Sequence, residues 1–306
     1  MARKPHAHDK APRPRLTKTE MTRRLKRTPA YRLAYKDLDF LSTEDCRPIR
    51  LELELLKPEL LLRQNNIVST IVVFGSTRIH DPAEARRAVV RLERLVRRAP
   101  HDPQLRRRLR IARSVEAKSH YYEAAREFGR IVSEESQGNT ENPYVIVTGG
   151  GPGIMEAANR GAHDVEAKSI GLNITLATEQ EPNPYITPEL CMQFHYFAVR
   201  KMHFMLRARA LVAFPGGYGT LDELFEALTL VQTGVMKPLP IILFGEDYWR
   251  GLINFDYLVD QGVIDQDDLN LFVFADTARD AWEYIKYFYA EENNNHGIRD
   301  RRRPRP

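Results

Sequence analysis

The sequence has only two cysteines, Cys46 and Cys191, among its 306 residues. Two thiols cannot build a disulfide framework or a multi-thiolate metal site, so we expect both to be reduced, as in a cytoplasmic protein. The sequence also lacks any run of about eighteen apolar residues, and no apolar segment follows the charged residues at its N-terminus. We therefore expect a globular cytoplasmic protein with neither a membrane span nor a secretory signal.

Acidic residues are scarce in three basic segments of a chain whose net charge is +5. Residues 1–30 hold ten Lys or Arg against two acids, residues 86–113 hold eleven Arg against two acids, and residues 299–306 hold five Arg against one. The rest of the chain carries a net charge of −16. The two ends are poor in apolar residues, which predicts solvated, disordered tails. Because no aromatic residues are interleaved with the basic ones there, we do not expect nucleic acid as a partner.

Short β-branched runs alternate along the chain with segments of helical periodicity. We predict strands at 67–74, 144–147, 169–175, 210–214 and 240–244, and helices at 119–135, 196–209 and 221–233. This alternation predicts an α/β fold with a Rossmann-like doubly wound parallel sheet in a single domain. The predicted domain spans residues 36–290, with an N-terminal helical extension broken at Pro58 and an Arg-rich insertion at about 82–117. Residues 1–35 and 291–306 are predicted to be disordered basic tails.

Two glycine-rich loops each follow a predicted strand and open a helix. The first has the sequence TGGGPG at 148–153, and the second has PGGYGT at 215–220. Backbone N–H groups at a helix N-terminus bind anions, and glycine lets the backbone approach the anion closely. Either loop alone is equally consistent with a tight turn between a strand and a helix. Together they predict a phosphate-binding crevice at the carboxyl ends of the strands.

Three acids and two cations lie near these loops in the sequence. Asp222, Glu223 and Glu226 stand in the first turns of the helix after the second loop. Acids there can simply stabilise the helix dipole, but a carboxylate beside a phosphate site is unfavourable unless it has a chemical task. Arg200 and Lys201 lie in an otherwise apolar helical segment. They form either a solvated pair at the helix edge or a phosphate contact, for which arginine is well suited.

Three motifs in this order resemble the LOG family of nucleotide 5′-monophosphate phosphoribohydrolases, formerly labelled lysine decarboxylase-like. The motifs are TGGGPGIMEAANRGA at 148–162, the Arg200–Lys201 pair, and PGGYGTLDE at 215–223, which fits the pattern PGGxGTxxE. The resemblance covers roughly residues 67–250. The N-terminal extension and the Arg-rich insertion depart from the compact members of the family, so the oligomer and substrate choice of those members need not transfer.

The resemblance implies hydrolysis of the N-glycosidic bond of a nucleoside 5′-monophosphate, such as AMP or a cytokinin riboside monophosphate, to free base and ribose 5-phosphate. It implies at least a homodimer. By similarity, Glu223 and Arg200 are the catalytic residues. The implied substrate-binding residues are Gly75, Ser76, Gly150, Gly151, Gly153, Lys201, Gly216, Gly217, Tyr218, Gly219 and Thr220. The alternative function is a sensor or carrier that binds a nucleotide without cleaving it, because a fold does not guarantee turnover.

Cofactor and metal chemistry find little support in the sequence. Lys201 could form a Schiff base with pyridoxal phosphate, but its surroundings do not offer the acidic partner that the pyridine nitrogen of this cofactor needs. His195 and His203 are eight residues apart and do not match the usual spacing of metal ligands. We expect neither a cofactor nor a metal ion, and we expect a small nucleotide as the ligand.

Overall fold

The computed structural model describes residues 16–137, 143–176 and 181–300, with side chains described as far as residue 291. The chain divides into two compact units, residues 1–53 and 54–306. The described part of the first unit contains helices α1 (Lys18–Leu25) and α2 (Leu38–Leu41), short 3₁₀ turns and the start of α3 (Arg47–Gln64). Pro58 lies inside α3 and does not end the helix, contrary to the prediction.

Helix α1 forms where the composition predicted disorder. Its N-terminus carries a capping box, in which the Thr17 hydroxyl accepts the Glu20 N–H at 3.3 Å and the Glu20 carboxylate accepts the Thr17 N–H at 2.8 Å. This short-range pattern satisfies backbone donors that composition alone does not reveal. The last helix, α12 (Ala278–Asp300), likewise continues into the predicted C-terminal tail. Residues 1–15 and 301–306 lie outside the described residues, and their disorder stays a prediction.

The second unit is built on a seven-stranded sheet in which every strand pair is parallel. The strand order is β4-β3-β2-β1-β5-β6-β7, so the chain builds outward on one side of β1 and then returns to build on the other. This arrangement confirms the predicted doubly wound parallel sheet. The strands are β1 (Ser69–Phe74), β2 (Tyr144–Thr148), β3 (Ser169–Ile174), β4 (Cys191–Phe194), β5 (Ala208–Ala213), β6 (Ile241–Phe244) and β7 (Val273–Ala275).

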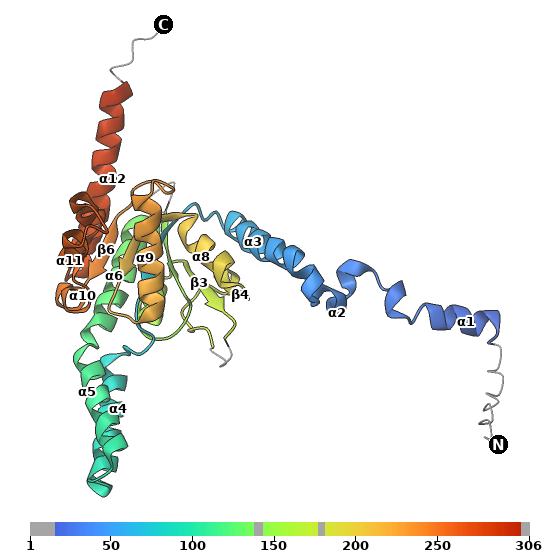
Figure 1. The fold of residues 1–306 in the computed structure, drawn as a ribbon, viewed down its shortest axis with the longest axis horizontal. Coiled ribbons are helices and arrows are strands. Elements are labelled where there is room, and N and C mark those ends of the chain that lie inside the picture. Colours follow the sequence, from blue (N-terminus) through green and yellow to red (C-terminus); the bar gives the residue numbers. More distant parts are fainter. Residues whose placement is uncertain (1–15, 138–142, 177–180, 301–306) are drawn as a thin grey trace, which may run out of the picture. The chain divides into compact units, whose positions relative to one another are not determined.

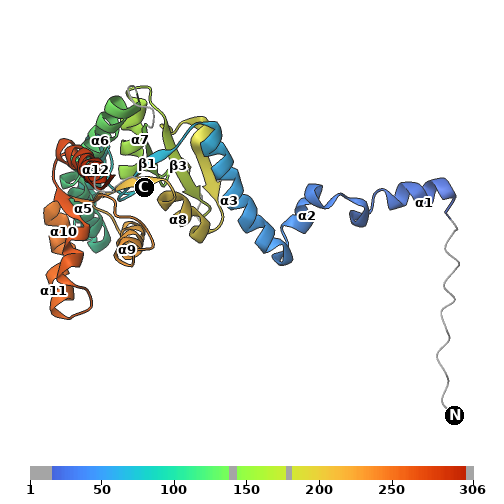
Figure 2. The same cartoon turned by 90° about the horizontal axis from the view of Figure 1, so that it is seen from above.

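Helices cover both faces of this sheet (Figures 1 and 2). The main core packs α6 (His120–Gln137), α7 (Ile154–His163) and α12 against the strands on one face. Helices α8 (Phe197–Met205) and α9 (Tyr218–Gln232) cover the other face. Helix α8 is shorter than predicted because Ala208 already begins β5. Helices α10 (Glu246–Leu252) and α11 (Phe255–Asp260) follow β6.

The predicted Arg-rich insertion is a helical hairpin of α4 (Pro82–Arg98) and α5 (Pro103–Ala117), which lie side by side (Figure 1). Each helix begins with proline at its first position, after an aspartate cap. Asp81 accepts the Ala83 N–H at 2.9 Å, and Asp102 accepts the Gln104 N–H at 2.8 Å. The break between the helices therefore falls just before the Asp102 cap and Pro103.

Helices α6 and α7 approach each other closely through glycine. A Cβ atom on Gly129 would lie 2.2 Å from the Ala158 carbonyl oxygen, and one on Gly161 would lie 2.0 Å from the Arg126 carbonyl oxygen. Each glycine thus makes room for the backbone of the facing helix. This contact sets the distance between α6 and α7, and α7 starts at the first glycine loop.

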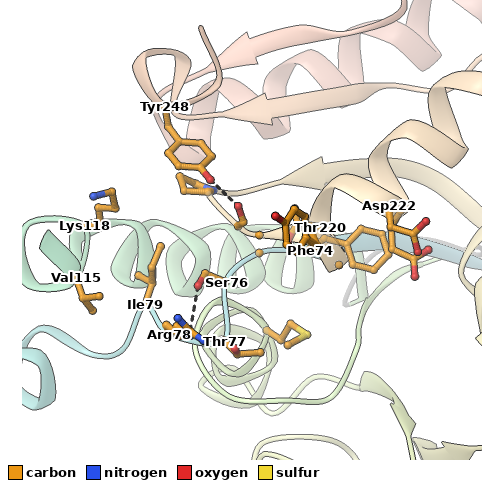
Figure 3. A pocket seen from close by; sticks show the side chains of 18 of the residues that line it. Phe74, Ser76, Thr77, Arg78, Ile79, Val115, Lys118, Thr220, Asp222 and Tyr248 are labelled. Atoms are coloured by element: carbon orange, nitrogen blue, oxygen red, sulfur yellow. Dashed lines mark hydrogen bonds between the residues drawn. The ribbon is translucent and has the colours of Figure 1, made fainter. Parts of the chain in front are cut away.

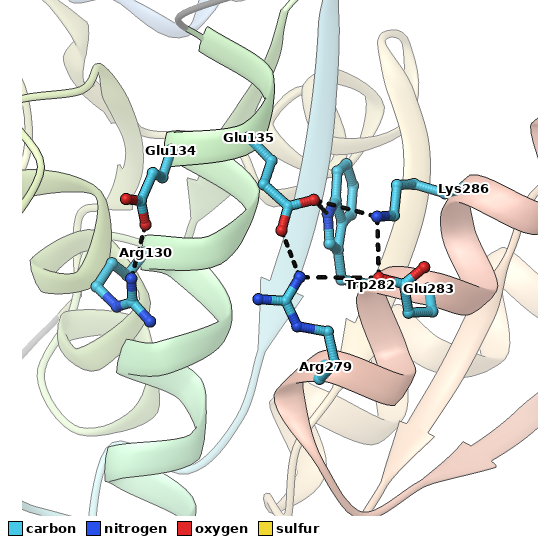
Figure 4. A network of polar contacts seen from close by, with 7 residues as sticks. All are labelled: Arg130, Glu134, Glu135, Arg279, Trp282, Glu283 and Lys286. Atoms are coloured by element: carbon cyan, nitrogen blue, oxygen red, sulfur yellow. Dashed lines mark hydrogen bonds and ion pairs between the residues drawn. The ribbon is translucent and has the colours of Figure 1, made fainter.

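A polar network joins α6 to α12 beside this core (Figure 4). Glu135 accepts a hydrogen bond from the Trp282 indole at 2.6 Å, pairs with Lys286 at 3.1 Å and is contacted by Arg279. These donors, the Trp282 hydrogen bond first, lower the pKa of Glu135 to about 2. The carboxylate therefore stays ionised at any physiological pH and ties the two helices together.

The glycine contact between α6 and α7 predicts a steric effect of added methyl groups. We expect Gly161→Ala to lower the free energy of unfolding by about 1–3 kcal/mol, because the new methyl group would overlap the Arg126 carbonyl. Gly251→Ala in α10 is the matched control, since its Cβ would meet nothing within 4 Å. Urea denaturation of both variants measures the difference, and equal stabilities would show that α6 and α7 can separate without cost.

Candidate active site

A candidate site lies where the order of the strands reverses. Strand β1 pairs with β2 on one side and β5 on the other, and the loops after β1 and β5 diverge at their carboxyl ends. Ligands of open α/β sheets bind in the crevice that this divergence creates. A cavity of about 710 Å³ occupies this position (Figure 3). It is large enough to hold a nucleotide.

Most of the predicted site residues line this cavity. The lining includes Gly75, Ser76, Arg200, Gly216, Gly217, Tyr218, Gly219, Thr220 and Glu223. Among the residues that the structure describes, the lining does not include Gly150, Gly151, Gly153 or Lys201. The loop after β5 thus faces the loop after β1 across the cavity, and the loop after β2 stands behind them.

The N-terminus of α9 forms one wall of the cavity. Gly217 is its N-cap residue, and the N–H groups of the first turn have no partner within the helix. The Tyr248 hydroxyl donates to the Gly216 carbonyl at 2.5 Å. Because a trans peptide holds its C=O and the next N–H in opposite directions, this bond also fixes the direction of the Gly217 N–H. The wall therefore has the features of an anion site, with the buried Thr220 beside it.

Two carboxylates of α9, Asp222 and Glu223, line the cavity, and Glu223 is the buried one. Its side chain is buried, with 7% of the residue exposed, and its Oε2 atom has no hydrogen-bond partner among the described residues. Burial raises the pKa of Glu223 to about 7, although the positive charges of Lys201 and Arg200 act in the opposite direction. A carboxyl group with this pKa can hold or release a proton near neutral pH.

The other two acids of α9 are occupied by Lys201. The Lys201 ammonium lies 2.9 Å from Asp222 and 3.1 Å from Glu226. Because these two acids hold its ammonium, Lys201 lies outside the cavity lining. Its charge still reaches Glu223 and lowers the pKa of that group. Lys201 therefore contributes to the electrostatics of the site from behind the wall.

Arg200 is fixed within the site by contacts on several sides. Its Nε donates to the Leu172 carbonyl at 2.8 Å, and its guanidinium carbon lies 5.2 Å from the centre of the Phe204 ring. A Cβ atom on Gly149 would come within 2.6 Å of its Nη2 atom, so the first glycine loop makes room for the guanidinium. Burial lowers the pKa of Arg200 while Glu223 raises it. Arginine keeps its charge even so.

The rest of the first glycine loop is held by protein groups. The Asn183 backbone N–H donates to the Gly150 carbonyl at 2.8 Å, and the Asn183 side-chain amide donates to the Gly151 carbonyl at 3.1 Å. Gly153 has a φ of +73°, and a Cβ atom there would lie 2.4 Å from the Ser76 carbonyl oxygen. The Ile154 N–H donates to this same oxygen at 3.1 Å. The loop after β2 thus supports the loop after β1 from behind.

Several lining residues were missed in the sequence. The end of α5 contributes Ile111, Ser114, Val115 and Lys118. Val115 and Lys118 lie on the same side of the cavity as Ile79 (Figure 3). Met155, Phe197 and Tyr248 come from three other helices. The one signal available for α5 was its place in the chain, soon after the carboxyl end of β1, where sites of parallel sheets lie.

The two histidines considered as metal ligands occupy different surroundings. His203 is buried in α8, 3.5 Å from Glu59, and its ring packs against Phe194. His195 contributes its backbone N–H, which donates to Glu54 at 2.7 Å. Within the described ranges, no group of three or more His, Cys, Asp or Glu side chains is placed to hold a metal ion. No helix in those ranges is both long and apolar enough to cross a membrane.

The buried Glu223 predicts a pH-dependent stability. Its folded-state pKa of about 7 lies above the ordinary 4.5, so its ionisation destabilises the fold as the pH rises from 4.5 to 7. We expect Glu223→Gln to stabilise the protein more at pH 8 than at pH 5. The difference between the two effects on the free energy of unfolding should be on the order of 3 kcal/mol. Urea titrations at both values measure this, with the exposed Glu189→Gln as control. An equal effect of Glu223→Gln at both values would contradict the raised pKa.

The chain is similar in sequence to a family model and to named plant proteins. The family model described as "Possible lysine decarboxylase" matches residues 155–285. The cytokinin riboside 5′-monophosphate phosphoribohydrolase LOG3 of Arabidopsis thaliana is 30% identical over 168 residues, which are 53% of this chain and 73% of LOG3. The probable cytokinin riboside 5′-monophosphate phosphoribohydrolase LOG4 of Oryza sativa subsp. japonica is 30% identical over 137 residues. These are 44% of this chain and 58% of that relative.

One solved structure with a similar fold is the molybdenum cofactor carrier protein from Chlamydomonas reinhardtii. It is 16% identical, with a TM-score of 0.43, and the match covers 72% of this chain and 98% of that protein. The family model spans the loop that opens α9, and the match to Arabidopsis LOG3 covers most of that relative. On this similarity the chain belongs to the LOG family.

Proposed function

We propose that the protein hydrolyses the N-glycosidic bond of a nucleoside 5′-monophosphate, releasing the free base and ribose 5-phosphate. The observation that carries this proposal is the unpartnered, buried Glu223 carboxylate in a cavity walled by a helix N-terminus. The site thus combines an anion-binding wall with a proton-accepting group. The names of the relatives, which are phosphoribohydrolases of cytokinin riboside monophosphates, support the reaction class.

The 5′-phosphate is proposed to bind at the start of α9. The N–H groups of Gly217, Tyr218 and Gly219 and the Thr220 hydroxyl can donate to its oxygens. Ser76 offers a further hydroxyl from the opposite loop, while its N–H is engaged by the Pro215 carbonyl at 2.9 Å. This position lets the ribose extend along α9 to Glu223, one helical turn after the phosphate wall.

Cleavage develops positive charge on the ribose ring as the bond from C1′ to the base breaks. The Glu223 carboxylate can stabilise this charge and accept a proton from the water that attacks C1′. The base then leaves with the bonding electron pair and takes up a proton. Arg200, held by Leu172 and Phe204, lies where it can contact the phosphate or the departing base. Lys201 keeps part of the Glu223 population ionised near neutral pH.

AMP and a cytokinin riboside monophosphate both fit this chemistry, and AMP is proposed as the simplest substrate. The rival is a sensor or carrier protein that binds the nucleotide without cleaving it. The raised pKa of Glu223 favours the enzyme, because binding alone does not need a buried carboxylate beside a phosphate wall. The homodimer and the cytoplasmic location stay predictions, which the molar mass in solution and the location of a tagged chain would test.

Glu223→Gln separates binding from turnover. With purified protein and AMP, we expect adenine and ribose 5-phosphate to appear by chromatography, and we expect the variant to lose at least about 100-fold in kcat. Its affinity for AMP, measured by calorimetry, should stay within a few-fold, because the amide keeps the shape of the side chain. Binding of AMP without release of base by the native protein would instead identify a carrier, and loss of binding in the variant would make Glu223 structural.

Lys201 gives a second test through the pH profile. The kcat/KM of the native protein is expected to rise with pH as Glu223 ionises near pH 7. Lys201→Met removes a charge that lowers the pKa of Glu223, so the rising limb should move to higher pH. Lys237→Met, at an exposed lysine, is the control. An unchanged limb in Lys201→Met would show that another group sets the profile.

A further inference from the structure

The proposed function does not explain the arginine-rich composition of the hairpin of α4 and α5. Between Pro82 and Ala117 it contains eleven arginines and no lysine, against four acids. All eleven arginines are exposed. They are Arg86, Arg87, Arg91, Arg94, Arg97, Arg98, Arg106, Arg107, Arg108, Arg110 and Arg113. The basic group of the hairpin is therefore the guanidinium throughout.

These arginines are almost without acidic partners. In the part of the chain that the structure describes, only Arg113 of the eleven forms an ion pair, with Glu93 at 2.9 Å. Like charges three and four residues apart destabilise a helix, so the hairpin carries a repulsion that the pair between Arg113 and Glu93 offsets only in part. A bound polyanion would remove that repulsion. The −16 net charge outside the basic segments also leaves the hairpin as the place where a polyanion can approach the folded unit.

The helical spacing gathers the charge on outward faces. Arg87, Arg91, Arg94 and Arg98 recur every three or four residues, which places them on one face of α4 over roughly 16 Å. The opposite face carries Ala85, Val89 and Leu92, which are buried. On α5, the arginines at 106, 110 and 113 share a face, and the opposite face brings Ile111 and Val115 to the cavity.

We propose that this hairpin binds the phosphate backbone of a nucleic-acid duplex. Arginine contacts phosphate oxygens in pairs, and a row of phosphates is the polyanion whose spacing matches a row of side chains along a helix. Neither helix carries an aromatic residue on which unpaired bases could stack, which favours a duplex over a single strand. The apolar face of α4 is already buried, so it cannot enter a lipid bilayer as an amphipathic helix does.

This surface is distinct from the two basic tails. On the tails we expect no nucleic acid, because no aromatic residues are interleaved with their basic ones. The tails are Pro-rich, whereas the arginines of the hairpin are held at fixed spacing on two packed helices. Such contacts read the backbone and not the bases, so binding should not depend on the base sequence. The proposal is also independent of nucleotide hydrolysis.

Fluorescence anisotropy with labelled 20-base-pair DNA and RNA duplexes tests the proposal on the full-length protein. Contacts with four or five phosphates predict a slope of about −4 in a plot of log K against log salt, or roughly a 250-fold loss of affinity from 50 to 200 mM. The DNA and RNA arms show which duplex is preferred. No binding to either duplex at 50 mM salt would overturn the proposal, as would tighter binding to vesicles that contain phosphatidylserine.

A variant with Arg87, Arg91, Arg94 and Arg98 all changed to Gln locates the surface. Glutamine has a helix propensity close to that of arginine, so circular dichroism should be unchanged. We expect Kd at 50 mM salt to rise roughly 30-fold and the slope of log K against log salt to become less negative by about 3. The control changes Arg301, Arg302, Arg303 and Arg305 to Gln, which removes the same charge from the C-terminal end.

Equal losses in the two variants would show that net charge, and not the hairpin, drives binding, which would contradict the proposal. If the α4 variant loses helix, the corresponding change of Arg106, Arg110 and Arg113 to Gln on α5 replaces it. With that variant, we expect roughly a 10-fold weaker Kd than in a control with three of the C-terminal arginines changed. An unchanged Kd there would equally overturn the proposal.

Discussion

A buried carboxylate, with one oxygen that has no hydrogen-bond partner in the described part of the chain, is the constraint around which the site is arranged. Glu223 is costly to ionise in its surroundings, and the protein offsets this only in part with the charges of Arg200 and Lys201. Each of these cations is in turn fixed. Leu172 holds Arg200, while Asp222 and Glu226 hold Lys201. The result is a carboxyl group whose pKa stands near neutrality because two positioned charges compete with burial.

The topology of the sheet explains how these groups meet. Strand β1 is the point from which the chain builds in both directions, so the loops after β1 and β5 open a crevice between them. The loop after β2 then acts as support, with Gly149 beside Arg200 and Gly153 against Ser76. Two glycine loops of similar sequence therefore have different tasks. The one that opens α9 faces the cavity, and the one that opens α7 keeps the neighbouring loop and the arginine in place.

The sequence predicted the parts of this structure that depend on short-range patterns. The central strands and the helix after each glycine loop follow from local periodicity, while the catalytic roles of Glu223 and Arg200 stay predictions from the motifs. The edge strands β4 and β7 were missed because they have four and three residues and no long apolar run. The pairing of Lys201 with Asp222 and Glu226 could not be predicted, since it joins two helices about twenty residues apart in sequence. Likewise, only the fold brings Ile111 and Val115 to the cavity.

Charge along the chain has a different meaning once the fold is known. A net charge of +5 suggests a basic protein, yet most of the acids lie in the sheet domain, and eleven of the described arginines stand on one hairpin. Helix α5 belongs to both environments, because its arginines face outward while its other side lines the cavity. A ligand on either side of α5 therefore constrains the same helix. Since coupling between two sites requires a shared element whose state both ligands affect, α5 is the element through which the two surfaces could be linked.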